Sequence, residues 1–386
     1  MMRWARLVFA LSAGLGPGWA QTFAILPFFD RTGHPGWAWM GESVSELLLD
    51  AFASEGLLVA PRGDREEVMR RLRLRPGVPL TQASVVKIGM GLDATHVIFG
   101  QIEAPEGQLR LTATMLDIKR LSAGLRTVVS GPREELSWLG AQLAWQLLKT
   151  IWTGAGLTLE LYLERRPPVR VDALEAYVRG LLASADVERI RCFSQAARLS
   201  PGFMPPVFQL GWTYLARKQW QEAALWMSRV SPDSPRYREA LFHLGVARYH
   251  LGDYEGAEQA FSAIKELVPL SEVLNNLGAA QSRAGREGAL EVLEQALAGD
   301  PADPTYHFNL GLALLKRGDG ARAAERFRAV LERDPLDGEA RMLLRAAADP
   351  VAARRVAASA LERIKVNFEE SAYLQLKALL NPGAPQ

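Results

Sequence analysis

A Leu-Gly pair recurs at nearly constant spacing through the second half of this 386-residue chain. The glycines of successive pairs are 34, 33 and 33 residues apart. An alanine follows each glycine by eleven or twelve residues, and a bulky side chain stands four residues after the alanine. These columns are Gly211, Gly245, Gly278 and Gly311; Ala223, Ala257, Ala289 and Ala323; and Met227, Phe261, Leu293 and Phe327. Such a period predicts a repeat architecture in which each unit is one supersecondary motif.

The spacing within each unit is that of a helix, a short turn and a second helix. The small residues of the columns stand where two helices approach most closely. One helix pair cannot bury its apolar face alone, so neighbouring pairs must stack into a solenoid. The residue two positions before each glycine is polar in every unit, and we interpret it as a hydrogen-bonding position. The four residues are Gln209, His243, Asn276 and Asn309.

These columns resemble the tetratricopeptide repeat (TPR) family, whose fold is an all-α superhelical solenoid. Four clear repeats and a degenerate one before them are predicted over residues 171–338. The pattern ends after Pro335 and gives way to helical segments predicted at 339–347, 350–366 and 368–380. We interpret residues 339–386 as capping helices and a tail at the open end of the solenoid.

Residues 21–166 have a different pattern, in which short apolar or β-branched runs alternate with helical stretches. Helices are predicted at 40–56, 64–74, 81–92 and 134–151. Strands are predicted at 23–29, 56–61, 95–103, 108–118 and 124–130. This order predicts an α/β domain with a mixed sheet covered by helices.

Three segments of this domain resemble known envelope proteins. FAILPFFDRTG, VVKIGMGLDATHVIFGQI and TMLDIKRLSAG are similar to the amino-terminal domain of the TolB family and to the related curli-secretion CsgG-like proteins. The resemblance implies protein contacts or assembly in the cell envelope, and no catalysis.

The first twenty residues have the pattern of a secretory signal peptide. Arg3 and Arg6 precede an apolar run, and small residues lead up to Ala20. The run is about half of the roughly 20 apolar residues that span a bilayer. We therefore expect cleavage after Ala20, export to the bacterial periplasm or outer envelope, and no transmembrane span in the mature chain. Cys192 is the only cysteine, which excludes internal disulfides.

No constellation typical of catalysis or metal binding occurs in the sequence. None of the five histidines belongs to an HExxH motif, and there is no phosphate-binding glycine loop. His243 and His250 share a helix face but lie about 10.5 Å apart along it, too far for one metal. The DPLDGE run at 334–339 lacks the alternating carboxylates of a calcium loop, so we interpret it as an inter-repeat turn with a helix cap. We expect no enzyme, no cofactor and no metal.

Charge also gives little support for nucleic-acid binding. The chain has 45 basic and 43 acidic residues, so a polycationic surface is not expected. The densest basic run is Arg65, Arg70, Arg71, Arg73 and Arg75. Acidic neighbours dilute this run, and we interpret it as a solvated helix face.

A stripe on the first helix of each repeat is the best-motivated candidate for an interaction surface. In the TPR family, the corresponding stripe lines the concave groove that binds peptides. The stripe is apolar in three of the four clear repeats, and in the third it carries Asn275, Ala279 and Ser282. The groove candidates are Phe208, Trp212, Leu215, Phe242, Val246, Tyr249, His250, Phe308, Leu312 and Lys316. A helix that is apolar on both faces is expected to be covered on both.

Two interpretations of this stripe remain open. It packs against neighbouring helices or the chain's own amino-terminal domain, or it holds a peptide or helix of a protein partner with its aromatic residues as anchors. The family's carboxylate clamp for chaperone tails needs Asn where Trp212, Val246 and Leu312 stand, so we expect another ligand class. We predict a non-catalytic adaptor between proteins. The alternative is an oligomerising accessory or regulatory subunit of a secretion or envelope-assembly machine.

Overall fold

The computed structural model describes residues 21–75, 77–151, 158–370 and 373–374. The expected signal peptide, residues 1–20, lies outside this part of the chain. The chain divides into two compact units. The first unit is built mainly from residues up to Ala183 and the second mainly from Phe203–Glu370, with 195–202 assigned to the first and 184–194 to the second. Within the described residues, no helix is long and apolar enough to cross a membrane.

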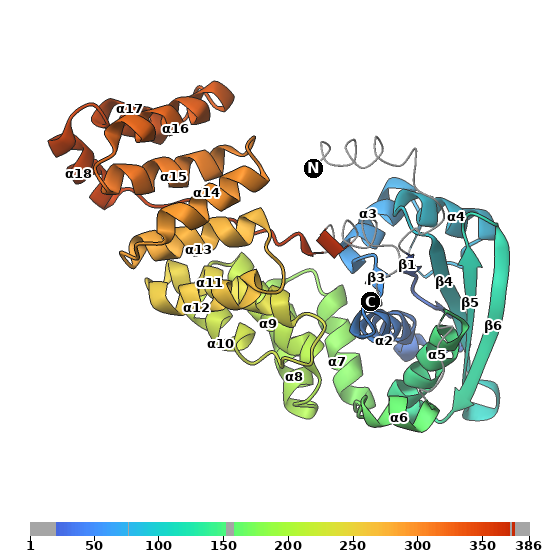
Figure 1. Ribbon diagram of the computed structural model, residues 1–386. Coiled ribbons are helices and arrows are strands. Elements are labelled where there is room, and N and C mark those ends of the chain that lie inside the picture. Colours follow the sequence, from blue (N-terminus) through green and yellow to red (C-terminus); the bar gives the residue numbers. More distant parts are fainter. Residues whose placement is uncertain (1–20, 76, 152–157, 371–372, 375–386) are drawn as a thin grey trace. The chain divides into compact units, whose positions relative to one another are not determined.

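A mixed sheet is the centre of the first unit (Figure 1). Its described strands are β1 (Thr22–Ile25), β2 (Phe29–Asp30), β3 (Leu58–Val59), β4 (His96–Glu103), β5 (Leu109–Asp117) and β6 (Ser122–Gly131). The order is β3-β1-β4-β5-β6, and β2 also pairs with β4. Strands β1 to β4 pair in parallel, whereas β5 and β6 are antiparallel to their neighbours. The predicted α/β class is therefore confirmed.

Helices cover both faces of this sheet. Successive side chains of β1 point to opposite faces, and each of them meets a different helix. Phe23 meets Phe52 of α2 (Met40–Ser54), with ring centroids 5.2 Å apart. Ala24 packs instead with Val85 and Ile88 of α4 (Gln82–Gly91). The remaining described helices of the unit are α3 (Arg62–Arg71), α5 (Leu136–Ile151), α6 (Leu159–Glu164) and α7 (Val171–Leu182), with single turns at η1 (Pro35–Trp37), η2 (Pro105–Gly107) and η3 (Arg133–Glu135).

The strand predicted at 23–29 is two strands, β1 and β2. Pro27 between them has no N–H to donate to a ladder. The N–H of Phe28 leaves the sheet and donates to the carbonyl of Gly41 at 3.0 Å. A Cβ on Gly41 would lie 2.0 Å from the carbonyl oxygen of Phe28, so this approach requires glycine.

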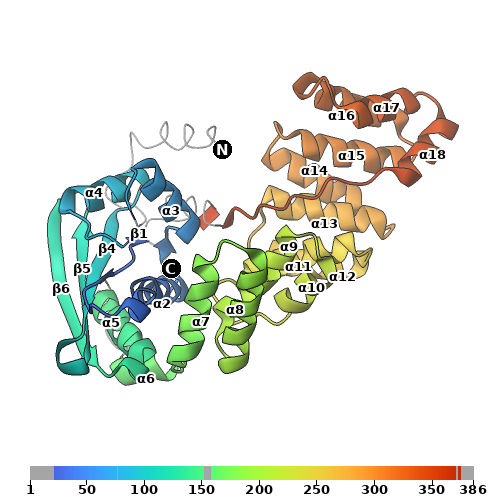
Figure 2. The same ribbon diagram turned by 180° about the vertical axis from the view of Figure 1, so that it is seen from behind.

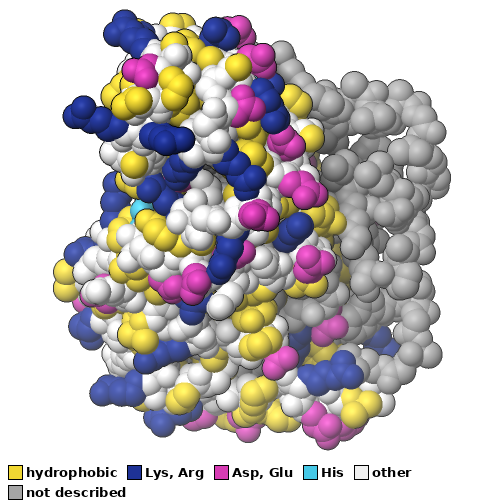
Figure 3. Space-filling view, turned by 60° about the vertical axis from the view of Figure 1, so that its left-hand side comes forward, with side chains coloured by type: hydrophobic (Ala, Val, Ile, Leu, Met, Phe, Trp, Pro, Cys, Tyr) yellow, Lys and Arg dark blue, Asp and Glu magenta, His cyan; other side chains and the backbone are white. Residues whose placement is uncertain are grey.

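The interpretation of the arginine run as a solvated face is wrong for Arg65. Its guanidinium is buried, donates to Ser45 Oγ at 2.6 Å and to the Ile25 carbonyl at 2.9 Å, and pairs with Glu42. Arg70 and Arg71 are exposed, and both pair with Glu67. On the face shown in Figure 3, basic, acidic and apolar side chains are interspersed.

The second unit consists of helix pairs at the predicted repeat spacing. It follows α8 (Asp186–Leu199), which the two units share. The first helices of the pairs are α9 (Met204–Ala216), α11 (Tyr237–His250), α13 (Ser271–Arg283) and α15 (Pro304–Lys316). The second helices are α10 (Trp220–Met227), α12 (Tyr254–Lys265), α14 (Ala289–Gly299) and α16 (Gly320–Arg333).

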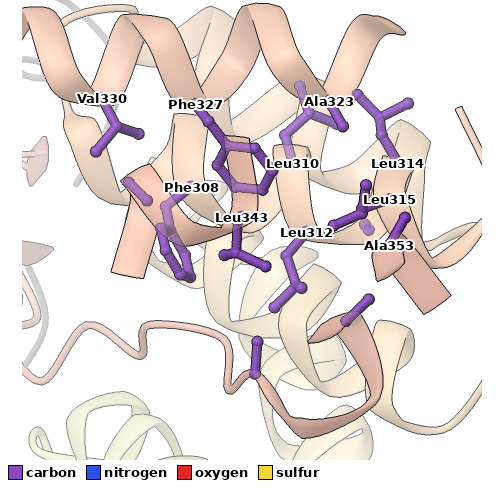
Figure 4. Close-up of a cluster of buried hydrophobic side chains, with 14 of the residues drawn as sticks. Phe308, Leu310, Leu312, Leu314, Leu315, Ala323, Phe327, Val330, Leu343 and Ala353 are labelled. Atoms are coloured by element: carbon purple, nitrogen blue, oxygen red, sulfur yellow. The ribbon is translucent and has the colours of Figure 1, made fainter. Parts of the chain in front are cut away.

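Each repeated glycine lies against the bulky side chain of the second helix in its pair. A Cβ on Gly245 would lie 2.7 Å from the ring of Phe261, and a Cβ on Gly278 would lie 2.6 Å from Leu293. Gly211 faces Met227 and Gly311 faces Phe327 in the same way. Phe308, Leu310 and Phe327 of the last pair form one buried cluster with Leu343 of the helix that follows (Figure 4). The period is therefore set by close contact between the two helices of each pair.

After the last repeat come α17 (Gly338–Ala346) and α18 (Pro350–Ser359). Asp337 caps α17 by accepting from the N–H of Ala340 at 3.0 Å, which confirms the helix-cap interpretation of the DPLDGE run. The helix predicted at 350–366 ends at Ser359, and residues 360–369 are not helical. Most of the helix predicted at 368–380 lies outside the described residues.

Candidate peptide-binding groove

Residues 360–370, here called the tail segment, lie along the first helices of the repeats. Figure 2 shows the segment after α18 running back past α15 and α13. Its hydrogen bonds reach α15 and α13, and its last residues contact α11. The segment therefore runs in the opposite direction to the order of the repeats, within the second unit.

Four of the groove candidates contact this segment, namely Phe242, Tyr249, Phe308 and Lys316. Phe208, Leu215, Phe242, Val246, Tyr249, Phe308 and Leu312 are buried. Lys316 is partly buried, whereas Trp212 and His250 are exposed. The chain's own carboxyl-terminal segment covers part of this surface. Neither of the two interpretations left open by the sequence included this arrangement.

Two asparagine side chains hold the backbone of the tail segment. Asn309 donates to the carbonyl of Arg363 at 2.8 Å and accepts from its N–H at 2.7 Å. Asn276 does the same with Lys365, at 2.8 Å and 2.9 Å. Asn275 joins the two by donating to Arg363 O and Asn276 Oδ1 while accepting from Asn309. Alternate residues of an extended chain turn the same edge to a neighbour, so the asparagines bind one edge of a strand-like segment.

Glu362 of the tail segment ends in a pocket of four donors. Its carboxylate accepts from Tyr249 Oη at 3.0 Å, Ser282 Oγ at 2.8 Å, Arg283 Nε at 2.6 Å and Lys316 Nζ at 2.5 Å. The side chain is fully buried, with 0% of its surface exposed. A buried carboxylate needs partners of this kind to offset its lost hydration.

The pKa values in this pocket follow from burial and from two opposite charges. Burial acts to raise the pKa of Glu362, but the charges of Lys316 and Arg283 outweigh it and hold that pKa below its ordinary value. Burial lowers the pKa of Lys316, and the Glu362 carboxylate opposes this shift. Burial and the same carboxylate raise the pKa of Tyr249, so the phenol keeps its proton and donates it to Glu362.

Aromatic and charged contacts hold the side chains of the tail segment. The ring of Phe368 stacks on that of Phe242, with centroids 5.0 Å apart and an angle of 22° between the planes. The Arg363 guanidinium lies 3.6 Å from the ring centroid of Phe308. Further ion pairs join Arg363 to Asp337 and Glu339, Lys365 to Asp303, and Glu370 to Arg238.

The candidates on the earlier repeats have contacts of their own. His250 stacks on Trp220 with ring centroids 4.1 Å apart, and partial burial of its ring, together with the charge of Lys218, lowers its pKa. Trp212 packs edge-on against His243 at 4.7 Å. His243 stands in the same repeat position as Asn276 and Asn309. Its Nδ1 is buried and has no hydrogen-bond partner in the described chain. The contacts that Asn276 and Asn309 make with the tail segment therefore have no counterpart at His243.

The sequence placed Asn275 in the stripe but not among the groove candidates, and it missed Asn276, Asn309 and Arg283 as groove residues. A signal was present for two of them, because the polar position before the repeat glycine was interpreted as hydrogen-bonding. The sequence did not indicate the partner of these side chains. The partner is the backbone of a segment 54 to 89 residues away along the chain. Among the described residues, no group of three His, Cys, Asp or Glu side chains could hold a metal ion.

Residues 208–272 and 279–338 match the family model of the tetratricopeptide repeat. The chain contains tetratricopeptide repeats. The first TPR match begins in α9 and the second ends at the start of α17. No curated protein matches the chain.

Several solved structures are similar to part of the chain. The MamA RS-1 ArsTM double mutant is 24% identical, with a TM-score of 0.38, and the match covers 42% of this chain and 92% of that one. MamA 41-end from Desulfovibrio magneticus RS-1 is 23% identical, with a TM-score of 0.39 and coverages of 43% and 95%. YrrB, described as a TPR protein with an unusual peptide-binding site, is 18% identical, with a TM-score of 0.41 and coverages of 45% and 92%.

Proposed function

We propose that this chain is a non-catalytic adaptor whose TPR groove binds an extended segment of a partner protein. The observation that carries this proposal is the pair of asparagines on α13 and α15. Each satisfies both the N–H and the carbonyl of one residue in an extended chain. Buried backbone groups require such partners, and main-chain hydrogen bonds are a general way to bind extended peptides.

The proposed location is the bacterial periplasm or outer envelope. Support comes from the leader at residues 1–20, in which Arg3 and Arg6 precede an apolar run. The first unit would bring a second protein to the adaptor, as the resemblance of its sequence to TolB-like and CsgG-like domains suggests.

A second candidate function is assembly through the first unit. β6 is an edge strand of ten residues, paired in the described chain with β5. An edge strand of this length offers unpaired backbone groups to another chain. An oligomerising subunit of a secretion or envelope-assembly machine would use such an edge. A sedimentation profile that stays monomeric as concentration rises would count against this candidate.

The adaptor function is tested by crosslinking in the native cell and identification of the captured proteins. The test variant is Asn276→Leu with Asn309→Leu, which removes the backbone contacts at nearly constant side-chain size. The matched control is Gln295→Leu, at an exposed position where the amide donates to Glu291 on its own helix. We expect a partner captured by the wild type and the control to be lost in the double variant. An unchanged set of partners would contradict the proposal.

A further inference from the structure

We infer that the tail segment displays the class of partner that the groove accepts: an extended protein segment with a glutamate followed six residues later by an aromatic side chain. Such a partner must displace the chain's own residues 360–370. This inference rests on the proposed function and specifies what the groove recognises.

The burial pattern of the tail segment is that of a bound peptide and not of a core element. Helix α18 contributes Ala353 and Ala357 to the apolar cluster of the last repeat, which also includes Ala360. Beyond Ala360 the pattern changes, because Leu361 and Val366 are 60% and 49% exposed. The groove holds this segment through its backbone, the Glu362 carboxylate, the Phe368 ring and the ion pairs of Arg363, Lys365 and Glu370. Its aliphatic side chains beyond Ala360 are exposed or half-buried.

The pocket around Glu362 sets the first requirement. An uncharged residue at this position would leave Arg283 and Lys316 without their carboxylate, although they are only 14% and 22% exposed. Removing one partner of a largely buried ion pair is costly, because the remaining charge loses hydration without compensation. A basic residue would add repulsion. The pocket therefore selects for a carboxylate whose stem reaches as far as that of glutamate.

The remaining positions set weaker requirements. Asn309 and Asn276 bind backbone atoms of the first and third residues after the glutamate, so any residue except proline can donate there. The carboxylates of Asp337 and Asp303 favour basic side chains at these two positions. The sixth residue after the glutamate meets the face of Phe242, where Phe368 stacks. Stacking of this geometry adds to the burial of an aromatic ring.

Attachment to α18 gives the tail segment an advantage over any partner in solution. A short tether corresponds to an effective concentration on the order of millimolar. A partner segment with the same contacts would therefore bind the intact chain much more weakly than a chain in which the tail segment has been released.

The test uses a fluorescently labelled peptide of residues 360–370, ALERIKVNFEE, and two full-length proteins. One is the wild type, and the other carries Glu362→Ala and Phe368→Ala to release the tail segment while leaving the groove intact. We expect the released variant to bind the peptide at least tenfold more tightly than the wild type does. On that variant, a peptide with Glu362→Ala should bind at least tenfold more weakly. A peptide with Val366→Ala is the control and should bind like the native peptide.

Three results would overturn the inference. The first is equal binding of the native and Glu362→Ala peptides, and the second is no binding of the native peptide to the released variant. In either case, partner capture that depends on Asn276 and Asn309 would still support the proposed function. The third is self-association of the wild type that an excess of the peptide reverses, since the occupant would then be a second copy of this chain.

A second measurement applies if the released variant does not fold. Hydrogen exchange of the wild type is followed at Arg363 and Lys365, whose N–H groups donate to the asparagines. An excess of unlabelled native peptide should remove their protection, and the Glu362→Ala peptide should not. Equal effects of the two peptides would contradict the requirement for glutamate.

Discussion

Asn276 and Asn309 explain at the residue scale how the groove can hold a chain of varied sequence. Each amide donates and accepts at one residue of the tail segment, so these contacts depend on an extended backbone and not on side chains. Glu362 supplies the discrimination that the asparagines lack, because its pocket contains two cations. The asparagines of α13 and α15 thus bind the backbone, whereas other residues of α11, α13 and α15 bind the carboxylate.

Glu362 predicts a defined pH dependence. Its folded pKa is held below the ordinary value of 4.5, so its contribution to stability is present above that value and is lost as pH falls through the lower folded pKa. The Glu362→Gln variant should be less stable than the wild type by about 2 kcal/mol near neutral pH, and the difference should shrink below pH 4.5. Urea denaturation of both proteins at several pH values measures this difference.

Other titrating groups near the tail segment have the opposite pH dependence. Their contributions cancel in the difference between the wild type and the Glu362→Gln variant. Burial raises the pKa values of Glu272 and Glu370. Protonation of these two groups as the pH falls therefore stabilises the folded protein. They are present in both proteins, whereas the partners of Glu362 are Lys316, Arg283, Ser282 and Tyr249. A stability difference that does not change between pH 7 and pH 3 would contradict the assignment.

Gly245 gives a second prediction at the residue scale. A methyl group there would lie 2.7 Å from the Phe261 ring, so Gly245→Ala should lower the free energy of unfolding by about 1–3 kcal/mol through overpacking. The control is Gly338→Ala at the start of α17, where a Cβ meets nothing within 4 Å. The control should be neutral or slightly stabilising, and denaturant midpoints compare the two. Equal midpoints would show that the repeat glycine has no packing role.

At the scale of elements, the repeats could be predicted from the sequence because each helix pair carries its own packing columns. Gly278 and Leu293 lie close in sequence and meet directly in the structure. The break in the strand at 23–29 was missed, although Pro27 is a signal for it. The end of α18 could not be predicted, since LERIKVNFEE contains good helix formers. Contacts with Asn276, Asn309 and Phe242 keep that segment extended, and these residues are distant in sequence.

The tail segment itself gives a prediction at this scale. A chain that ends at Ser359 should expose Phe242 and Phe308, whose rings lie beside Phe368 and Arg363. We expect increased binding of a hydrophobic dye such as anilinonaphthalene sulfonate, and a decrease when peptide 360–370 is added. The control is the full-length chain with Leu361→Ala, at an exposed side chain, which should resemble the wild type. No increase in dye binding by the shortened chain would mean that other residues cover the rings.

At the scale of the whole molecule, the chain joins an α/β unit with a mixed sheet to a TPR unit. Repeat arrays gain stability from contacts between neighbouring units, and the tail segment adds links from the region after α18 to α15, α13 and α11. The sequence predicted a stripe on the first helices of the repeats, and Phe242, Tyr249 and Phe308 of that stripe contact the tail segment. It did not predict the occupant, because a periodic pattern reports local packing and not which distant segment lies across it.

Hydrogen exchange at Arg363 and Lys365 in the full-length chain tests the central claim most directly. If the groove binds an extended backbone, these two amides exchange slowly in the wild type and at least tenfold faster in the Asn276→Leu, Asn309→Leu variant. The Gln295→Leu control should keep the protection of the wild type. Fast exchange of both amides in the wild type, or equal protection in the wild type and the double variant, would contradict the account.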